Sequence, residues 1–226
     1  MGTANKEYQA QLRQLAELML AVSGESVTMM KRNAPEQALK LKRQDEWGIY
    51  LEFLKVMFNL TDRLTALHIP IKDQLEFMNG LEDAVTTQLK AVLEPAFGNN
   101  ADQMEIVLTV GNAVAESRDL YEKYKFLITE DSKPKNELFQ AFAERVAQTL
   151  GAPQNGQVIA AATLCASAII PAVSAVLQGQ APPAAAPSTP SQQPVTDAGN
   201  GEPAKKGPTG QDIKLVSLMS NVSGEE

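Results

Sequence analysis

Histidine and cysteine are the side chains best suited to metal binding and to nucleophilic catalysis, and this 226-residue chain has one of each, His68 and Cys165. Zinc sites take three or four protein ligands, and a carboxylate di-metal centre in a helical bundle takes two Glu-x-x-His pairs, a motif that the sequence lacks. His68 precedes Ile69 and Pro70, which is typical of a helix end, where a histidine interacts favourably with the helix dipole. Cys165 lies among small apolar residues and is interpreted as buried. We therefore expect no metal and no cofactor.

The remaining chemistry-bearing residues do not form a recognisable catalytic arrangement. Glu116, Asp119 and Glu122 share one helix face, which is typical of a solvated acidic surface. The glycines are scattered, and neither Gly-x-Gly-x-x-Gly nor Gly-x-x-x-x-Gly-Lys occurs, so no phosphate-binding loop is indicated. The sequence therefore predicts that the protein is not an enzyme.

Charge excludes one class of partner. The net charge is −7 and the pI is about 4.9, so the chain as a whole repels phosphate backbones, and we expect no nucleic acid partner. One local group of basic residues is interpreted as a solvated helix face, with a docking patch as the alternative. This group consists of Lys31, Arg32, Lys40, Lys42 and Arg43.

Nothing at the start of the chain indicates secretion. A basic stretch followed by an apolar stretch, the pattern of a signal peptide, does not open the sequence. A single cysteine is also compatible with a reducing compartment. The expected location is therefore the cytoplasm.

Proline divides the chain into three parts. Seven of the 13 prolines fall between Pro182 and Pro208, in a stretch rich in alanine and poor in large apolar residues. Such a stretch cannot offset the entropy lost on ordering, so it is predicted to be disordered. We expect a helical bundle domain over residues 1–178, a disordered Pro/Ala/Gly-rich linker over 179–210, and a short amphipathic segment over 211–226.

Helical spacing of apolar residues recurs through the first part, and alternating strand-like runs do not. The predicted fold class is all-α: a compact bundle of five or six helices with a long central helix, followed by a disordered Pro/Ala-rich tail. Helices are expected at residues 6–22, 35–68, 70–93, 100–128, 136–150 and 158–177. The first is expected to weaken at Ser23 and Gly24.

The helix predicted over 35–68 is the most informative. Nearly all of its second half is apolar, up to Leu64 and Leu67, which indicates a helix covered on several sides. Its polar residues form one narrow stripe, interpreted as a seam of little energetic importance, so that Glu52→Ala should cost under about 0.5 kcal/mol. The stripe consists of Asp45, Gly48, Glu52, Lys55, Asn59 and Asp62.

Residues 158–177 contain no charged side chain and are long enough to cross a bilayer. Alanine and serine are frequent among them, Pro171 interrupts them, and basic or aromatic anchors are missing at both ends. A buried bundle helix is therefore favoured over a membrane span, and membrane contact stays open.

The C-terminal segment has one apolar face, because Leu215, Leu218, Met219 and Val222 stand at i, i+3, i+4 and i+7. A helix this short is unstable alone in water and needs a surface, on a partner or on the chain itself. The simpler alternative is an unused chain end.

These features favour a non-enzymatic helical interaction module, an adaptor or scaffold, that binds a protein partner and uses the C-terminal segment for recognition. The alternative function is a helical carrier of hydrophobic ligands, or a membrane-associated protein that uses residues 158–177. The identity of the partner and the oligomeric state do not follow from the sequence.

Overall fold

The computed structural model describes residues 7–97, 103–125 and 137–180, and within these ranges the chain forms helices and no strands. This confirms the predicted all-α class. The C-terminal segment and nearly all of the linker predicted before it lie outside the described residues. The helices are α2 (Gln9–Asn33), α3 (Pro35–Ala38), α4 (Arg43–His68), α5 (Ile71–Phe97), α6 (Gln103–Tyr121), α7 (Glu137–Thr149) and α8 (Gly156–Leu177).

The prediction that the first helix weakens at Ser23 and Gly24 is wrong, because α2 continues without a break to Asn33. Val27 and Met30, beyond the glycine, are buried on the same face as the residues before it. Burying each of them contributes about 1.5–3 kcal/mol, whereas a glycine inside a helix costs about 1 kcal/mol. Tertiary burial therefore overrides the local preference.

The single helix predicted over 35–68 is divided in the structure. A short α3 ends at Ala38, and α4 begins at Arg43 after Lys42, whose backbone is extended. The Lys42 N–H donates to Asp45 Oδ2 at 3.0 Å, and Asp45 and Glu46 place negative charge in the first turn of α4. These features favour a new helix start at this point.

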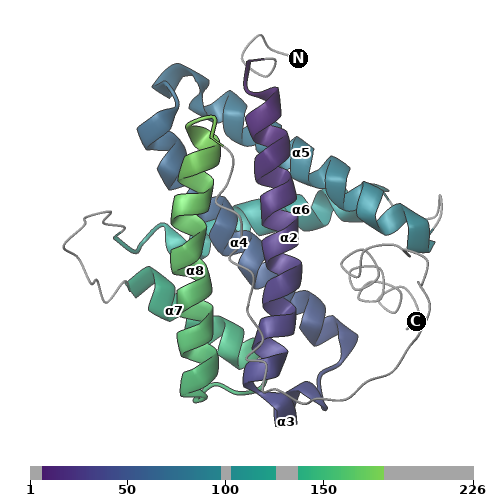
Figure 1. Ribbon diagram of the computed structural model, residues 1–226. Helices are drawn as coiled ribbons and strands as arrows, with labels where there is room; N and C mark the ends of the chain where they lie inside the picture. The colour runs from purple at the N-terminus through teal and green to yellow at the C-terminus, as the bar shows by residue number, and fades with distance from the viewer. Residues whose placement is uncertain (1–6, 98–102, 126–136, 181–226) are drawn as a thin grey trace, which may run out of the picture.

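Figure 1 shows α2 and α8 side by side on one face of the molecule, with α4, α5 and α6 behind them. α4 contacts α2, α5, α6, α7 and α8. It is therefore the central helix, as predicted, and nearly every residue from Trp47 to Leu60 is buried.

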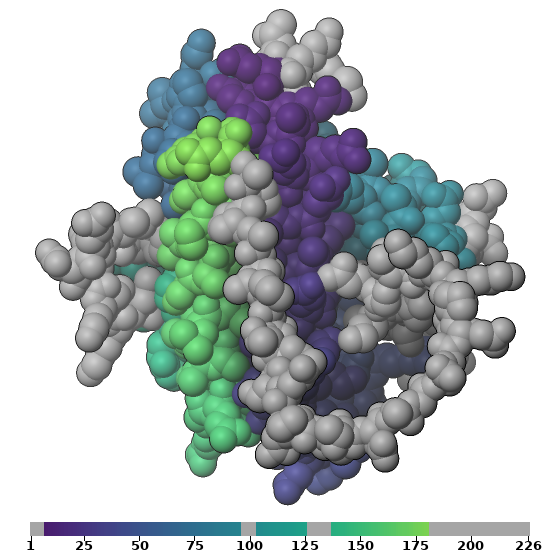
Figure 2. All heavy atoms as spheres, viewed as in Figure 1, coloured from purple at the N-terminus to yellow at the C-terminus, as the bar shows by residue number. Residues whose placement is uncertain are grey.

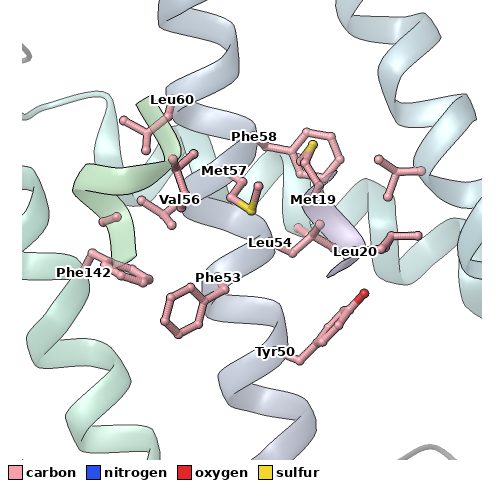
Figure 3. Packing of buried hydrophobic residues seen from close by; sticks show 14 of the residues in the cluster. Met19, Leu20, Tyr50, Phe53, Leu54, Val56, Met57, Phe58, Leu60 and Phe142 are labelled. Atoms are coloured by element: carbon pink, nitrogen blue, oxygen red, sulfur yellow. The ribbon is translucent and has the colours of Figure 1, made fainter. Parts of the chain in front are cut away.

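Aromatic and small residues set the contact between α4 and α7. The rings of Phe53 and Phe142 meet edge to face at 4.9 Å (Figure 3). At Gly48 the helices lie so close that an added Cβ would be 3.1 Å from Thr149 Cγ2. α7 can therefore pack against α4 at this level because position 48 has no side chain.

The turn between α7 and α8 is defined by its own hydrogen bonds. Gly151 adopts a positive φ of 74°, and the Ala152 N–H donates to the Ala147 carbonyl at 2.8 Å, which ends α7 in a Schellman motif. Asn155 then caps α8 by accepting from the N–H groups of Gln157 and Val158. α8 therefore begins at a fixed place and returns along α7.

We expect Leu54→Ala to lower the free energy of unfolding by about 2–5 kcal/mol, because the side chain is completely buried in the core and leaves a cavity. Chemical denaturation measures this directly. Ala66→Ser, at an exposed position of the same helix, is the control and should change stability by less than about 0.5 kcal/mol. Equal effects of the two substitutions would contradict the central position of α4.

Candidate functional site

The densest group of charged side chains in the described part of the chain lies between α4, α6 and α7. Glu52 of α4 is 6% exposed and accepts two hydrogen bonds from Arg145 of α7, from Nε to Oε2 and from Nη2 to Oε1, both at 3.0 Å. Lys55 Nζ lies 3.0 Å from Glu52 Oε1 and 2.7 Å from Glu116 Oε2 on α6. The Tyr121 hydroxyl donates to Glu52 Oε2 at 3.4 Å. We call these five residues the ionic cluster.

The electrostatics of the ionic cluster favour an ionised Glu52. Burial alone would raise the pKa of this carboxyl, but the hydrogen bond from Arg145 and the charge and hydrogen bond of Lys55 outweigh it, so the pKa is lowered. The same pairing raises the pKa of Arg145. Both groups are therefore charged when the protein is folded.

This arrangement is poorly suited to catalysis. A general base needs a pKa near the working pH and a lone pair within reach of the substrate. Glu52 has a lowered pKa and is almost completely buried. Both of its carboxylate oxygens already accept hydrogen bonds, from Arg145, Lys55 and Tyr121. The cluster therefore holds α4, α6 and α7 together instead of offering a reactive group.

A second polar contact fixes the end of α6. Arg63 donates to the carbonyls of Tyr121 at 2.7 Å and Tyr124 at 2.9 Å, and its Nε donates to Asn59 Oδ1 at 2.8 Å. The last carbonyls of a helix have no hydrogen-bond partner within the helix. A cation placed there also interacts favourably with the helix dipole. Arg63 is therefore a cap supplied by α4 to the neighbouring helix.

The interpretation of the α4 stripe as a seam of little energetic importance is wrong. Glu52, Lys55 and Asn59 are buried, and each has a partner on another helix. Removing the Glu52 carboxylate would leave Arg145 and Lys55 with a single carboxylate in the cluster, that of Glu116, which contacts Lys55. The expected cost of replacing Glu52 therefore rises from less than 0.5 to about 3 kcal/mol.

Arg145 was missed by the sequence analysis, although a signal for it exists. Leu138, Phe142, Arg145 and Thr149 follow one another at spacings of four, three and four on α7, so the arginine lies on the helix face that packs inward. An arginine on such a face needs an anion, and Glu52 is a buried carboxylate on the central helix. The two residues lie 93 positions apart, so only the fold shows that they meet.

The other chemistry-bearing residues stay apart. His68 is the last residue of α4, as expected. Cys165 Sγ lies 3.4 Å from Met29 Sδ, and burial raises the pKa of the thiol, which disfavours the reactive thiolate. Among the described residues no group of three or more His, Cys, Asp or Glu side chains could hold a metal ion. The predicted recognition residues Leu215, Leu218, Met219 and Val222 lie outside the described residues.

The corner where α4 meets α5 presents aliphatic side chains to solvent. Leu67 is 64% exposed, Ile71 is 87% exposed and Leu75 is 70% exposed. Ala66 and Pro70 are exposed beside them. We call these five residues the apolar corner. The prediction that Leu67 is covered is wrong, because Leu67 lies on the exposed side of the last turn of α4, whereas Thr65 and Ile69 are buried.

The backbone of the apolar corner is held by hydrogen bonds. The Ile69 N–H donates to Thr65 O at 2.9 Å, the Asp73 N–H donates to Pro70 O at 2.8 Å, and Gln74 Nε2 donates to Ile69 O at 3.0 Å. The Ile69 side chain is buried in the hydrophobic core. The corner therefore presents its exposed side chains from a defined backbone.

Comparison with known proteins finds no matching family model, no curated protein of similar sequence and no similar solved structure. The fold is an all-α bundle in which an ionic cluster centred on the buried Glu52 joins three helices, and aliphatic side chains are exposed where α4 meets α5.

We expect Glu52→Gln to lower the free energy of unfolding by about 3 kcal/mol near neutral pH, because it removes the charge that pairs with Arg145 and Lys55. Glu17→Gln is the matched control. It breaks the solvent-exposed pair with Arg13 and should cost less than about 0.5 kcal/mol. Urea denaturation of both variants makes the comparison, and similar losses would show that the cluster contributes no more than a surface pair.

The same variant tests the sign of the pH dependence. A carboxyl whose pKa is lowered by folding stabilises the protein above its unfolded pKa, and this contribution is lost as the pH falls through the folded pKa. The difference in unfolding free energy between the native protein and Glu52→Gln should therefore be constant near neutral pH and shrink below about pH 4. A difference that grows as the pH falls would contradict an ionised Glu52.

Proposed function

We propose that this chain is a non-enzymatic helical adaptor that inserts its apolar corner into an apolar groove on a partner protein. The observation that carries the proposal is the exposure of three aliphatic side chains where α4 meets α5, Leu67, Ile71 and Leu75. Contiguous exposed apolar residues commonly mark interaction sites on soluble proteins.

The shape of the corner indicates the kind of partner surface. Ile71 and Leu75 stand one turn apart at the start of α5, the spacing of the anchors that an amphipathic helix lays into a groove. Both side chains are largely exposed, so the complementary surface would be a groove that receives them. The hydrogen-bonded backbone reduces the entropy lost on binding, which favours affinity.

The C-terminal segment adds a second helical ligand to this proposal. Its apolar face, Leu215, Leu218, Met219 and Val222, is joined to the bundle through the proline-rich residues after Gln180. A tethered second contact raises the effective concentration of the first, so that two weak contacts give tight binding. The chain would then bind one partner at two places.

The membrane alternative is supported by one observation. α8 is, among the described residues, the one helix long and apolar enough to cross a membrane. Its buried residues, Val158, Ala162, Ala166, Ile169 and Val173 among them, are enclosed within the bundle, whose helices α2, α4 and α7 contact α8. A membrane span would require α8 to leave these contacts, so the adaptor function is the better supported of the two.

We expect the double substitution Ile71→Gln with Leu75→Gln to lower capture of the partner from native extract by at least about tenfold, because two aliphatic anchors are lost. The bait is the full-length protein. Leu108→Gln with Leu164→Gln, also at exposed aliphatic positions, is the matched control and should capture the partner as the native protein does. Capture that survives loss of the corner, or falls equally in the control, would contradict the proposal.

Deleting residues 211–226 should weaken or unmask partner binding and leave the thermal unfolding of the bundle nearly unchanged, because the segment lies beyond the last helix of the bundle. The same capture experiment and a thermal melt measure the two effects. Binding that is indistinguishable with and without the segment would remove it from the proposed interface.

A further inference from the structure

One end of this acidic molecule is basic. Between positions 31 and 43 the chain carries five basic residues and one acidic residue, Glu36, although its net charge is −7. These residues form the last turn of α2, the short α3, the turn that follows it, and the first residue of α4. α3 stands at one end of the molecule, the same end at which α8 begins (Figure 1). We call residues 31–43 the basic end.

Each of the two acidic residues at positions 45 and 46 contacts a residue of the basic end. Glu46 forms an ion pair with Lys31, and the Asp45 carboxylate accepts a hydrogen bond from the Lys42 backbone N–H. Arg32, Lys40 and Lys42 have exposed side chains. The charge presented to solvent at the basic end is therefore positive.

An aliphatic side chain projects from the middle of this basic segment. Leu39 is 90% exposed, whereas Leu41, two residues later, packs against the core. Leu39 is therefore not a member of the core, and it stands directly beside Lys40. An exposed leucine close to Lys40 and Lys42 is complementary to a surface that carries negative charge on the outside and has an apolar layer beneath it.

The neighbouring face of α8 adds no opposing charge. α8 has no charged residue from Gly156 to Leu177, and its outward positions include Ala160, Ser167 and Leu164, which is 70% exposed. Figure 2 shows α8 along the front face of the molecule, beside α2. A flat anionic surface that approaches the basic end is therefore not repelled by this helix.

We propose that the basic end binds the surface of an anionic phospholipid membrane, with Leu39 inserted at the boundary between headgroups and acyl chains and with Arg32, Lys40 and Lys42 on the lipid phosphates. Juxtamembrane basic residues and single apolar side chains contribute to interfacial binding in this way. The chain lies on the membrane and α8 stays in the bundle, which distinguishes this site from a membrane span.

The acidity of the rest of the chain does not oppose this contact. At physiological ionic strength the Debye length is about 8 Å, so charges at the far end of the molecule are screened from the membrane. The phosphates of a nucleic acid backbone could pair with the lysines, but a nucleic acid offers no apolar layer for Leu39. The combination of the two features therefore selects a lipid surface.

The test is co-sedimentation of the full-length protein with vesicles of phosphatidylcholine alone or with about one third phosphatidylserine, near physiological ionic strength. The native protein should sediment with the anionic vesicles and stay in solution with the neutral ones. Lys40→Gln with Lys42→Gln should weaken binding by about tenfold or more, since each cation near the surface contributes several-fold. Leu39→Gln should weaken it by about tenfold.

Lys72→Gln with Lys123→Gln is the matched control, because it removes the same charge from two exposed positions elsewhere. Vesicle binding of this variant should stay within about twofold of the native protein. All substituted side chains are exposed, so thermal unfolding should be unchanged in every variant. The apolar corner is intact in the Leu39 and Lys40/Lys42 variants, so partner capture is tested independently of membrane binding.

Three results would overturn the proposal. Equal sedimentation with neutral and anionic vesicles would show that the lysines do not act on headgroups. Equal loss in the two lysine pairs would show an effect of net charge alone. Binding to a polyglutamate peptide in a Lys40- and Lys42-dependent way, with no vesicle binding, would assign the basic end to an acidic protein.

Discussion

Because α4 is covered by five other helices, a charged side chain on its buried part must find a partner inside the protein or cost more free energy than it contributes. Glu52 meets this requirement by accepting hydrogen bonds from Arg145 and Lys55, and Lys55 meets it by reaching Glu116 as well. The rest of the packing around α4 depends on this pairing, since an unpaired charge at that depth would favour an open bundle.

Buried ion pairs are directional, and this gives the cluster a role that apolar contacts fill less well. The ring contact between Phe53 and Phe142 tolerates small slips of one helix along the other, whereas the two hydrogen bonds from Arg145 to Glu52 do not. Arg63 fixes the end of α6 in the same manner. The polar stripe of α4 therefore sets the positions of both α6 and α7.

In the interior and at two parts of the surface, side chains depart from the usual arrangement of charged residues outside and aliphatic residues inside. The charges of Glu52 and Lys55 lie inside, while Ile71 at the apolar corner and Leu39 at the basic end are the most exposed of the large apolar residues described. The interior arrangement has an intramolecular explanation, because each charge has its partner. The exposure of the aliphatic residues has no such explanation within the described chain. Their surroundings differ, because the residues of the apolar corner are uncharged and the basic end is cationic. This difference is why we propose different kinds of surface for them, a protein groove and an anionic membrane.

Local sequence was sufficient for the fold class and for most helix positions. Apolar periodicity indicated helices, Ile69 and Pro70 marked the end of α4, and the apolar content of α4 indicated its central place. Local sequence was insufficient at Ser23 and Gly24, where burial of Val27 and Met30 carries α2 onward, and at residues 39–42, where a new helix start interrupts the predicted one.

Tertiary structure alone decided what lies opposite each face. Periodicity shows which side chains share a face, but it does not show whether that face meets another helix or water. Glu52 was therefore taken for a residue of little energetic importance although it pairs with Arg145, and Leu67 was taken for a covered residue although its side chain is largely exposed. The partners of both residues, or their absence among the described helices, depend on contacts between segments far apart in the chain, and those contacts exist only after the bundle has formed.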